Sequence, residues 1–249
     1  MKDLREVSPR GKKILILSPH PDDDCLGMGA TISFLRKDNY LKIFYLTSGW
    51  RGVRGRISRE EKSNLREREA ISAVKLLGID EKAVRFLSLP FYEKGEVCSR
   101  DILILTEEIK RFRPQIIFTS AEEEDPHLTH KKCWQIVRES LKDLDFSFSI
   151  YIYQVWEIFR KFDYFFSFGK RLMERKLKAI KEHRSQLKPK YTKRGITSLG
   201  EWEVSLNRNY AKMLGKGFLY AEVFKTCPDN PEEDGYFRDE EGEVYKVMD

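Results

Sequence analysis

Apolar residues along the first half of the chain form short continuous runs separated by stretches with helical spacing. The continuous runs predict strands that are buried on both faces, at residues 14–17, 41–47, 84–89 and 115–120. Helical spacing predicts four helices between and after them, at residues 26–35, 60–78, 101–112 and 131–141. Alternation of strand and helix implies crossover connections, so we predict a Rossmann-like α/β fold with a mostly parallel sheet flanked by helices.

The second half of the chain gives a weaker pattern. Strands are predicted at residues 146–156 and 217–224, and helices at residues 174–187 and 207–214. The aromatic run at 159–168 is interpreted as core packing or a cover over a pocket, with a sugar-stacking platform as the alternative. Residues 229–249 are expected to form a small acidic C-terminal hairpin, an extension of one domain that covers residues 1–228.

Composition limits the class of protein. The chain has 249 residues, 41% of them hydrophobic, which is enough for one large core. No apolar run approaches the roughly 18 residues of a membrane span, and the first residues do not form a signal peptide. The four cysteines form no Cys-x-x-Cys pair, so neither a disulfide framework nor a zinc ribbon is indicated. We therefore expect a cytoplasmic protein without a membrane span.

Charge is distributed unevenly along the chain. The net charge is +6, but residues 229–249 carry nine acidic and two basic side chains. Residues 160–194 carry thirteen basic and three acidic ones. Such a basic field favours an anionic partner, namely a phosphorylated metabolite, a nucleic acid or an acidic membrane surface. The alternative is a solvated helix face.

A histidine and three carboxylates lie within five residues where the first predicted strand meets the first helix. They are His20, Asp22, Asp23 and Asp24. Ligands of open α/β sheets bind beyond the carboxyl ends of the strands, and imidazole and carboxylate groups are common zinc ligands. Asp22 and Asp23 are adjacent, so one could bind a metal while the other reaches a water molecule. Alternatively, these carboxylates only cap the helix.

Two further histidines, His127 and His130, follow the fourth predicted strand. A parallel sheet would bring this strand exit to the same crevice as His20. Either histidine could then bind the metal, while the other donates a proton or a hydrogen bond to a developing oxyanion. The second predicted strand ends in an arginine-rich segment that includes Arg51 and Arg54, which could bind an anion or simply be exposed surface.

Five ordered motifs together resemble the LmbE/PIG-L family of zinc-dependent de-N-acetylases. They are the run Ser18–Asp24, the helix pattern of Arg66, Glu69, Ala73, Leu77 and Gly78, the pair His127 and His130, the run from Lys176 to Gln186, and Ala221 to Phe224. Two departures stand out: Asp24 replaces the usual Glu, and Leu128-Thr129 replaces Pro-Asp. In these details the chain is most similar to the LmbE-like domain associated with glucosamine-6-phosphate deaminase-type proteins.

This resemblance implies a role for each matching residue. His20, Asp23 and His130 would bind Zn²⁺ or another divalent metal, Asp22 would be the general base, and His127 would assist as the second catalytic residue. Substrate-binding candidates are Arg51, Arg54, Arg66 and His183. The substrate would be an N-acetylglucosamine-type amino sugar that could be phosphorylated.

Alternatives stay open at this stage. The substrate could be another acylated amine, such as a thiol-sugar or a lipid-linked amino sugar. A nucleotide-binding protein would need a Gly-x-Gly-x-x-Gly turn directly after the first strand, which the acidic run precludes. A nucleic-acid binder would use residues 160–194 but would not need the His-Pro-Asp-Asp cluster. We therefore expect no nucleic-acid partner, and a homo-oligomer is compatible with the sequence.

Overall fold

A computed structural model describes residues 1–7, 10–90, 97–120, 127–156, 158–187, 198–215, 217–227, 236–238 and 244–246. The segments at 91–96, 121–126 and 188–197, which connect predicted elements, lie outside these ranges. Among the described residues, no helix combines the length and apolar character needed to cross a membrane.

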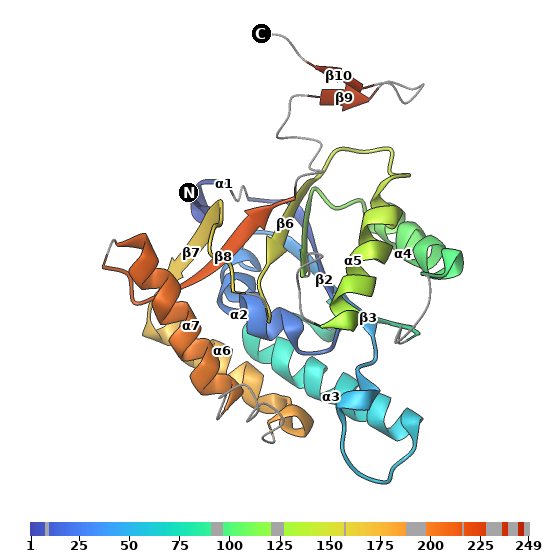
Figure 1. Ribbon diagram of the computed structural model, residues 1–249, viewed down its shortest axis with the longest axis horizontal. Helices are drawn as coiled ribbons and strands as arrows, with labels where there is room; N and C mark the ends of the chain where they lie inside the picture. Colours follow the sequence, from blue (N-terminus) through green and yellow to red (C-terminus); the bar gives the residue numbers. More distant parts are fainter. Residues whose placement is uncertain are drawn as a thin grey trace.

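The predicted α/β fold is confirmed, with helices on both faces of one large sheet (Figure 1). The strands are β1 (Lys2–Asp3), β2 (Lys13–Ser18), β3 (Tyr40–Thr47), β4 (Val84–Leu89), β5 (Ile116–Ser120), β6 (Ser149–Tyr153), β7 (Tyr164–Phe168), β8 (Tyr220–Thr226), β9 (Tyr236–Arg238) and β10 (Val244–Lys246). The α-helices are α1 (Leu4–Val7), α2 (Asp23–Leu35), α3 (Arg59–Leu77), α4 (Ser99–Phe112), α5 (Leu128–Leu141), α6 (Lys170–Glu182) and α7 (Leu199–Leu214). Short 3₁₀ helices are η1 (Trp50–Gly52), η2 (Glu81–Ala83) and η3 (Arg184–Gln186).

The eight-stranded sheet has the order β1-β7-β8-β6-β5-β2-β3-β4. All neighbouring pairs are parallel except the two that β8 makes with β6 and β7. β2 therefore lies between β3, which follows it in the chain, and β5, which is formed much later. This is a topological switch point, where open α/β sheets bind their ligands. The hairpin predicted near the C-terminus is also present, since β9 and β10 pair antiparallel in a separate sheet.

The central strand explains why the sheet has two cores. Ile14 and Ile16 of β2 face one hydrophobic cluster, and Leu15 and Leu17 face the other. The first cluster includes side chains of α2, α3 and α6, and the second includes α4, α5 and most of α7. A continuous apolar run is needed because both faces of the strand are covered.

A buried charge cluster fixes α2, the helix that begins at the candidate site. α2 is broken at Met28, where φ is −144° and ψ is 27°. The carboxylate of Glu222 in β8 accepts hydrogen bonds from the backbone N–H groups of Ala30 and Thr31 beyond this break, at 3.0 and 2.8 Å. Lys176 of α6 pairs with Glu222 at 2.8 Å and with Glu203 of α7 at 2.9 Å. The second half of α2 is thereby capped and tied to β8, α6 and α7.

Lys176→Met is expected to lower the free energy of unfolding by about 3–5 kcal/mol, because it leaves the buried Glu203 and Glu222 without their cation. Urea denaturation of the metal-free protein measures this effect. Lys178→Met changes an exposed lysine of the same helix and should stay within about 0.5 kcal/mol of the wild type. A similarly small loss for Lys176→Met would show that the cluster contributes little to stability.

Candidate metal centre

The turn between β2 and α2 is held by several hydrogen bonds. Thr47 at the end of β3 donates its backbone N–H and its hydroxyl to the carbonyl of Pro19, at 3.0 and 2.7 Å. The hydroxyl of Ser18 donates to the carbonyl of His20 at 2.7 Å. Asp22 occupies the N-cap position of α2, so the side chains of Asp22 and Asp23 leave the helix start in different directions.

The second pair of histidines comes from the start of α5, whose strand β5 neighbours β2. His127 is the N-cap residue of α5, and its Nδ1 accepts a hydrogen bond from the backbone N–H of Thr129 at 3.3 Å. His130 lies in the first turn of the helix and is fully buried. Helix α5 therefore begins three residues earlier than predicted from the sequence.

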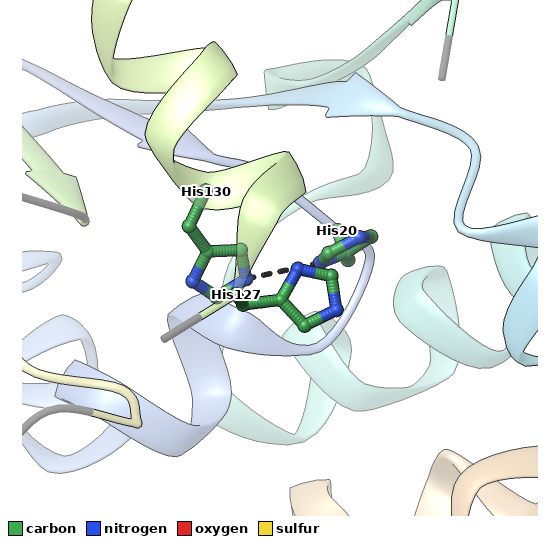
Figure 2. Close-up of side chains that lie close together, drawn as sticks. All are labelled: His20, His127 and His130. Carbon is green, nitrogen blue, oxygen red and sulfur yellow. Dashed lines mark hydrogen bonds between the residues drawn. The ribbon is translucent and has the colours of Figure 1, made fainter. Parts of the chain in front are cut away.

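Three donor atoms from these two strand exits converge on one point. Figure 2 shows the imidazoles of His20 and His130 from the two exits, with that of His127 near them. Nδ1 of His20 lies 3.0 Å from Oδ2 of Asp23, and Nε2 of His130 lies 3.1 Å from the same oxygen. The two ring nitrogens are 3.1 Å apart. The expectation that His20 and His130 lie close together is therefore met, while the roles of these residues stay predictions.

This donor set fits a zinc ion. Tetrahedral zinc with bonds of about 2.0–2.2 Å holds neighbouring ligand atoms about 3.3 Å apart, close to the observed separations. His127 contributes a further imidazole, since its ring centroid lies 4.9 Å from that of His20 and 4.7 Å from that of His130. His20, His127 and His130 each have a ligand-capable nitrogen within 4.8 Å of the others. Whether His127 or Asp23 joins His20 and His130 at a metal stays a prediction, because both offer a donor atom close to the two imidazoles.

The surroundings of Asp23 favour its ionised form. Burial by itself would raise the pKa of Asp23, but the charges of His130 and His20, and their hydrogen bonds, hold it well below its usual value. Asp23 is therefore ionised although it is buried. A carboxylate must be ionised to bind a metal.

Asp24, the third carboxylate of the turn, is fully buried. Its Oδ2 accepts a hydrogen bond from the hydroxyl of Tyr45 at 3.2 Å, and its Oδ1 has no partner among the described residues. Burial raises the pKa of Asp24 to about 7, with smaller contributions from the neighbouring carboxylates. Its position therefore points to support of the turn and away from metal binding.

The predicted substrate-binding residues lie in different environments. Arg51 and Arg54 are exposed on the segment after β3. Arg66 of α3 is only 2% exposed, and its guanidinium bonds to the carboxylate of Asp22. His183 is 1% exposed at the end of α6. Of these four predicted residues, Arg51 and Arg54 are the two whose charged groups lie at the surface.

His183 gives the protein an expected sensitivity to acid. Neither ring nitrogen has a hydrogen-bond partner among the described residues, and burial lowers the pKa of His183 to about 4. The imidazole is neutral in both states above about pH 6.5. Between about pH 6.5 and 4 this histidine is protonated mainly in the unfolded chain. The free energy of unfolding therefore falls by up to about 3 kcal/mol as the pH is lowered through this range. His183→Gln should remove this part of the pH dependence in urea unfolding series, and an unchanged slope would contradict it.

Two contacts that matter for the site were not predicted from the sequence. Glu69 of α3 accepts hydrogen bonds from the backbone N–H and the hydroxyl of Ser185, both at 2.7 Å. Lys176 pairs with Glu222, as described above. All four residues lie in the motifs noted in the sequence, but nothing in the motifs shows that they contact one another.

Comparisons with known proteins agree with this geometry. Residues 15–141 match the PIG-L family, described as GlcNAc-PI de-N-acetylase. A Bacteroides thetaiotaomicron protein named as glucosamine-6-phosphate deaminase-like is 25% identical over 183 residues, covering 53% of this chain and 28% of that protein. This chain thus corresponds to less than a third of that relative's length.

Solved structures share the fold. N,N'-diacetylchitobiose deacetylase from Pyrococcus horikoshii has a TM-score of 0.72 at 24% identity, over 90% of this chain and 88% of that one. GalB, the 4-carboxy-2-hydroxymuconate hydratase from Pseudomonas putida KT2440, has a TM-score of 0.68 at 16% identity, over 87% and 96%. The fold thus carries more than one chemistry. The family match covers more than half of the chain and includes the converging His20, Asp23 and His130, and the protein therefore belongs to the PIG-L (LmbE-like) family of de-N-acetylases.

Proposed function

We propose that this protein is a zinc-dependent hydrolase that removes the N-acetyl group from an N-acetylglucosamine-type amino sugar. The observation that carries the proposal is the convergence of His20, Asp23 and His130 on one point, with a second carboxylate on Asp22, the residue before Asp23. A zinc ion bound there would polarise an amide carbonyl and acidify a water molecule.

In the proposed reaction, Asp22 and His127 take part in the proton transfers. Asp22 accepts a proton from the attacking water, whose oxygen forms a bond to the acetyl carbon while the carbonyl π electrons move to oxygen. His127 lies beside the three donors and can hydrogen-bond to that oxyanion. As the carbon–nitrogen bond breaks, the nitrogen takes the proton from Asp22 or His127. The net reaction converts amide and water into acetate and a free amine.

An anionic group on the substrate is supported by the segment that follows β3. Its second residue, Gly49, packs against Pro21, which places the start of the segment beside the turn that carries Asp22. Arg54 and Arg56 farther along are exposed, and neither has a carboxylate within 4.0 Å among the described residues. An arginine fork suits phosphate or carboxylate. A phosphorylated amino sugar is therefore the favoured substrate, with a thiol-sugar or lipid-linked acylated amine as the alternative.

The test is an assay of the zinc-loaded protein with N-acetylglucosamine, its 6-phosphate, N,N'-diacetylchitobiose and a lipid-linked N-acetylglucosamine. We expect acetate and free amine in equal amounts, with the highest kcat/KM for the phosphorylated sugar. Comparable kcat/KM values with and without phosphate would contradict the anionic substrate but leave the hydrolase intact. No amine release from any of the four, at one zinc per chain, would overturn the proposed function.

A further inference from the structure

Arg66 is a large, fully enclosed side chain whose hydrogen bonds go to one partner. It lies in the middle of α3 and is 2% exposed. Nη2 donates to Oδ1 of Asp22 at 2.7 Å, and Nη1 donates to Oδ2 of the same carboxylate at 3.3 Å. Paired donation by a guanidinium fixes both the distance and the plane of a carboxylate.

The surroundings of Arg66 keep the guanidinium in this place. Gly49, two residues after β3, has a φ of +62°, and a Cβ built on it would lie 3.1 Å from Nε and Nη2 of Arg66 and 3.1 Å from Cδ of Pro21. The guanidinium therefore lies between the β3 exit and the turn that carries Asp22. One helical turn after Arg66, Glu69 binds Ser185 twice, which fixes α3 against the segment that follows α6.

The carboxylate of Asp22 can still accept a proton although it is hydrogen-bonded to Arg66. A carboxylate can accept about four hydrogen bonds, and Arg66 uses two of these positions. The side chain of Asp22 is 10% exposed, whereas that of Arg66 is 2% exposed. The carboxylate is thus more accessible to water than the guanidinium that holds it.

We infer that Arg66 is a positioning residue that holds the carboxylate of Asp22 in the orientation needed to take a proton from water. The inference rests on the proposed function and replaces the sequence-based interpretation of Arg66 as a substrate-binding residue. A guanidinium that is buried and committed to Asp22 does not have the exposure that substrate contact requires. Misplacing a catalytic group by about 1 Å can lower a rate about 100-fold, so the effect of this contact should appear in kcat.

Three roles for Arg66 predict different kinetics. A positioning role lowers kcat and leaves KM and zinc content unchanged. A substrate-binding role raises KM. A purely structural role lowers the melting temperature and the zinc content, and activity falls in proportion to the folded, zinc-loaded fraction.

The experiment uses the zinc-loaded full chain and the best substrate of the assay above. For Arg66→Lys, which keeps the charge but loses the fork, we expect kcat to fall about tenfold with KM within about twofold of the wild type. Arg66→Ala should lose more, and added methylguanidinium should restore part of its kcat. Arg68→Ala, an exposed arginine two residues along the same helix, is the matched control and should keep wild-type kinetics.

A double-mutant cycle shows whether Arg66 acts through Asp22. Adding Arg66→Ala to Asp22→Asn should lower kcat little further, since the group that Arg66 positions no longer works as a base. A raised KM at unchanged kcat, additive effects in the cycle, or zinc loss and unfolding in both Arg66 variants would each overturn the inference. A wild-type protein without deacetylase activity would overturn the proposed function itself, and the inference would fall with it.

Discussion

Asp22→Asn is expected to lower kcat for deacetylation by about 10²–10⁴-fold, the usual contribution of a general base. Asparagine has nearly the same shape as aspartate and can still accept a hydrogen bond from Arg66, but it cannot take a proton from water. The donor atoms of His20, Asp23 and His130 do not include Asp22, so zinc binding should persist. The measurement is steady-state kinetics together with metal analysis of the same preparation.

An exposed aspartate provides the control for this substitution. Asp143→Asn, just after α5, should keep wild-type kcat and zinc content. Full activity of Asp22→Asn would show that another group takes the proton, and the only other carboxylates at this turn are Asp23 and Asp24. Loss of zinc by Asp22→Asn would instead show that Asp22 binds the metal, in conflict with its contact to Arg66.

The first half of the fold could be predicted because its signals are local. β2 is a continuous apolar run. α3 is capped at its start by Ser58, through a capping box with Glu61, and at its end by Gly78, where φ is +90°. Each of these features depends on residues close together in the sequence. The order of strands around β2 then follows from the alternation of strand and helix.

Elements of the second half were missed or shortened for identifiable reasons. β7 was interpreted as aromatic packing. All its residues, Tyr164–Phe168, are buried, so its sequence shows no alternation of apolar and polar residues that would predict a strand. In the sheet it lies between β1 and the antiparallel β8. α7 was predicted to begin at residue 207, although Ser198 caps it through the N–H of Glu201 at 3.1 Å. That Ser-x-x-Glu signal was present in the sequence. The two-residue β1 gives no pattern to detect.

The candidate site could be located from the sequence, but its supporting contacts could not. Two strand exits in a parallel sheet must lie at the same edge, and this places His20 near His130. In contrast, Arg66 meets Asp22 across 44 residues and Lys176 meets Glu222 across 46, through side-chain packing between separate elements. A single sequence contains no local signal for such pairs, so Arg66 was interpreted from the helix motif it belongs to, as a substrate-binding residue.

His130→Ala is expected to abolish stoichiometric zinc binding and with it deacetylation. Nε2 of this residue is one of the three converging donors, the side chain is fully buried, and removing it leaves two ligands, one fewer than catalytic zinc sites ordinarily have. Metal analysis after dialysis against a weak chelator, together with the deacetylation assay, gives the result. An intact fold must be shown by circular dichroism of the same sample.

His127→Ala is the matched comparison, because it removes the neighbouring imidazole of the same helix start. His127 caps α5 through Nδ1 and lies beside the three donors, so its loss should leave zinc bound while kcat falls about 10²–10³-fold through the missing oxyanion contact. The reverse pattern, with zinc lost from His127→Ala and kept by His130→Ala, would exchange the two roles. His20, His127 and His130 form one cluster of potential ligands, so this pair of variants decides which two imidazoles join Asp23 at the metal.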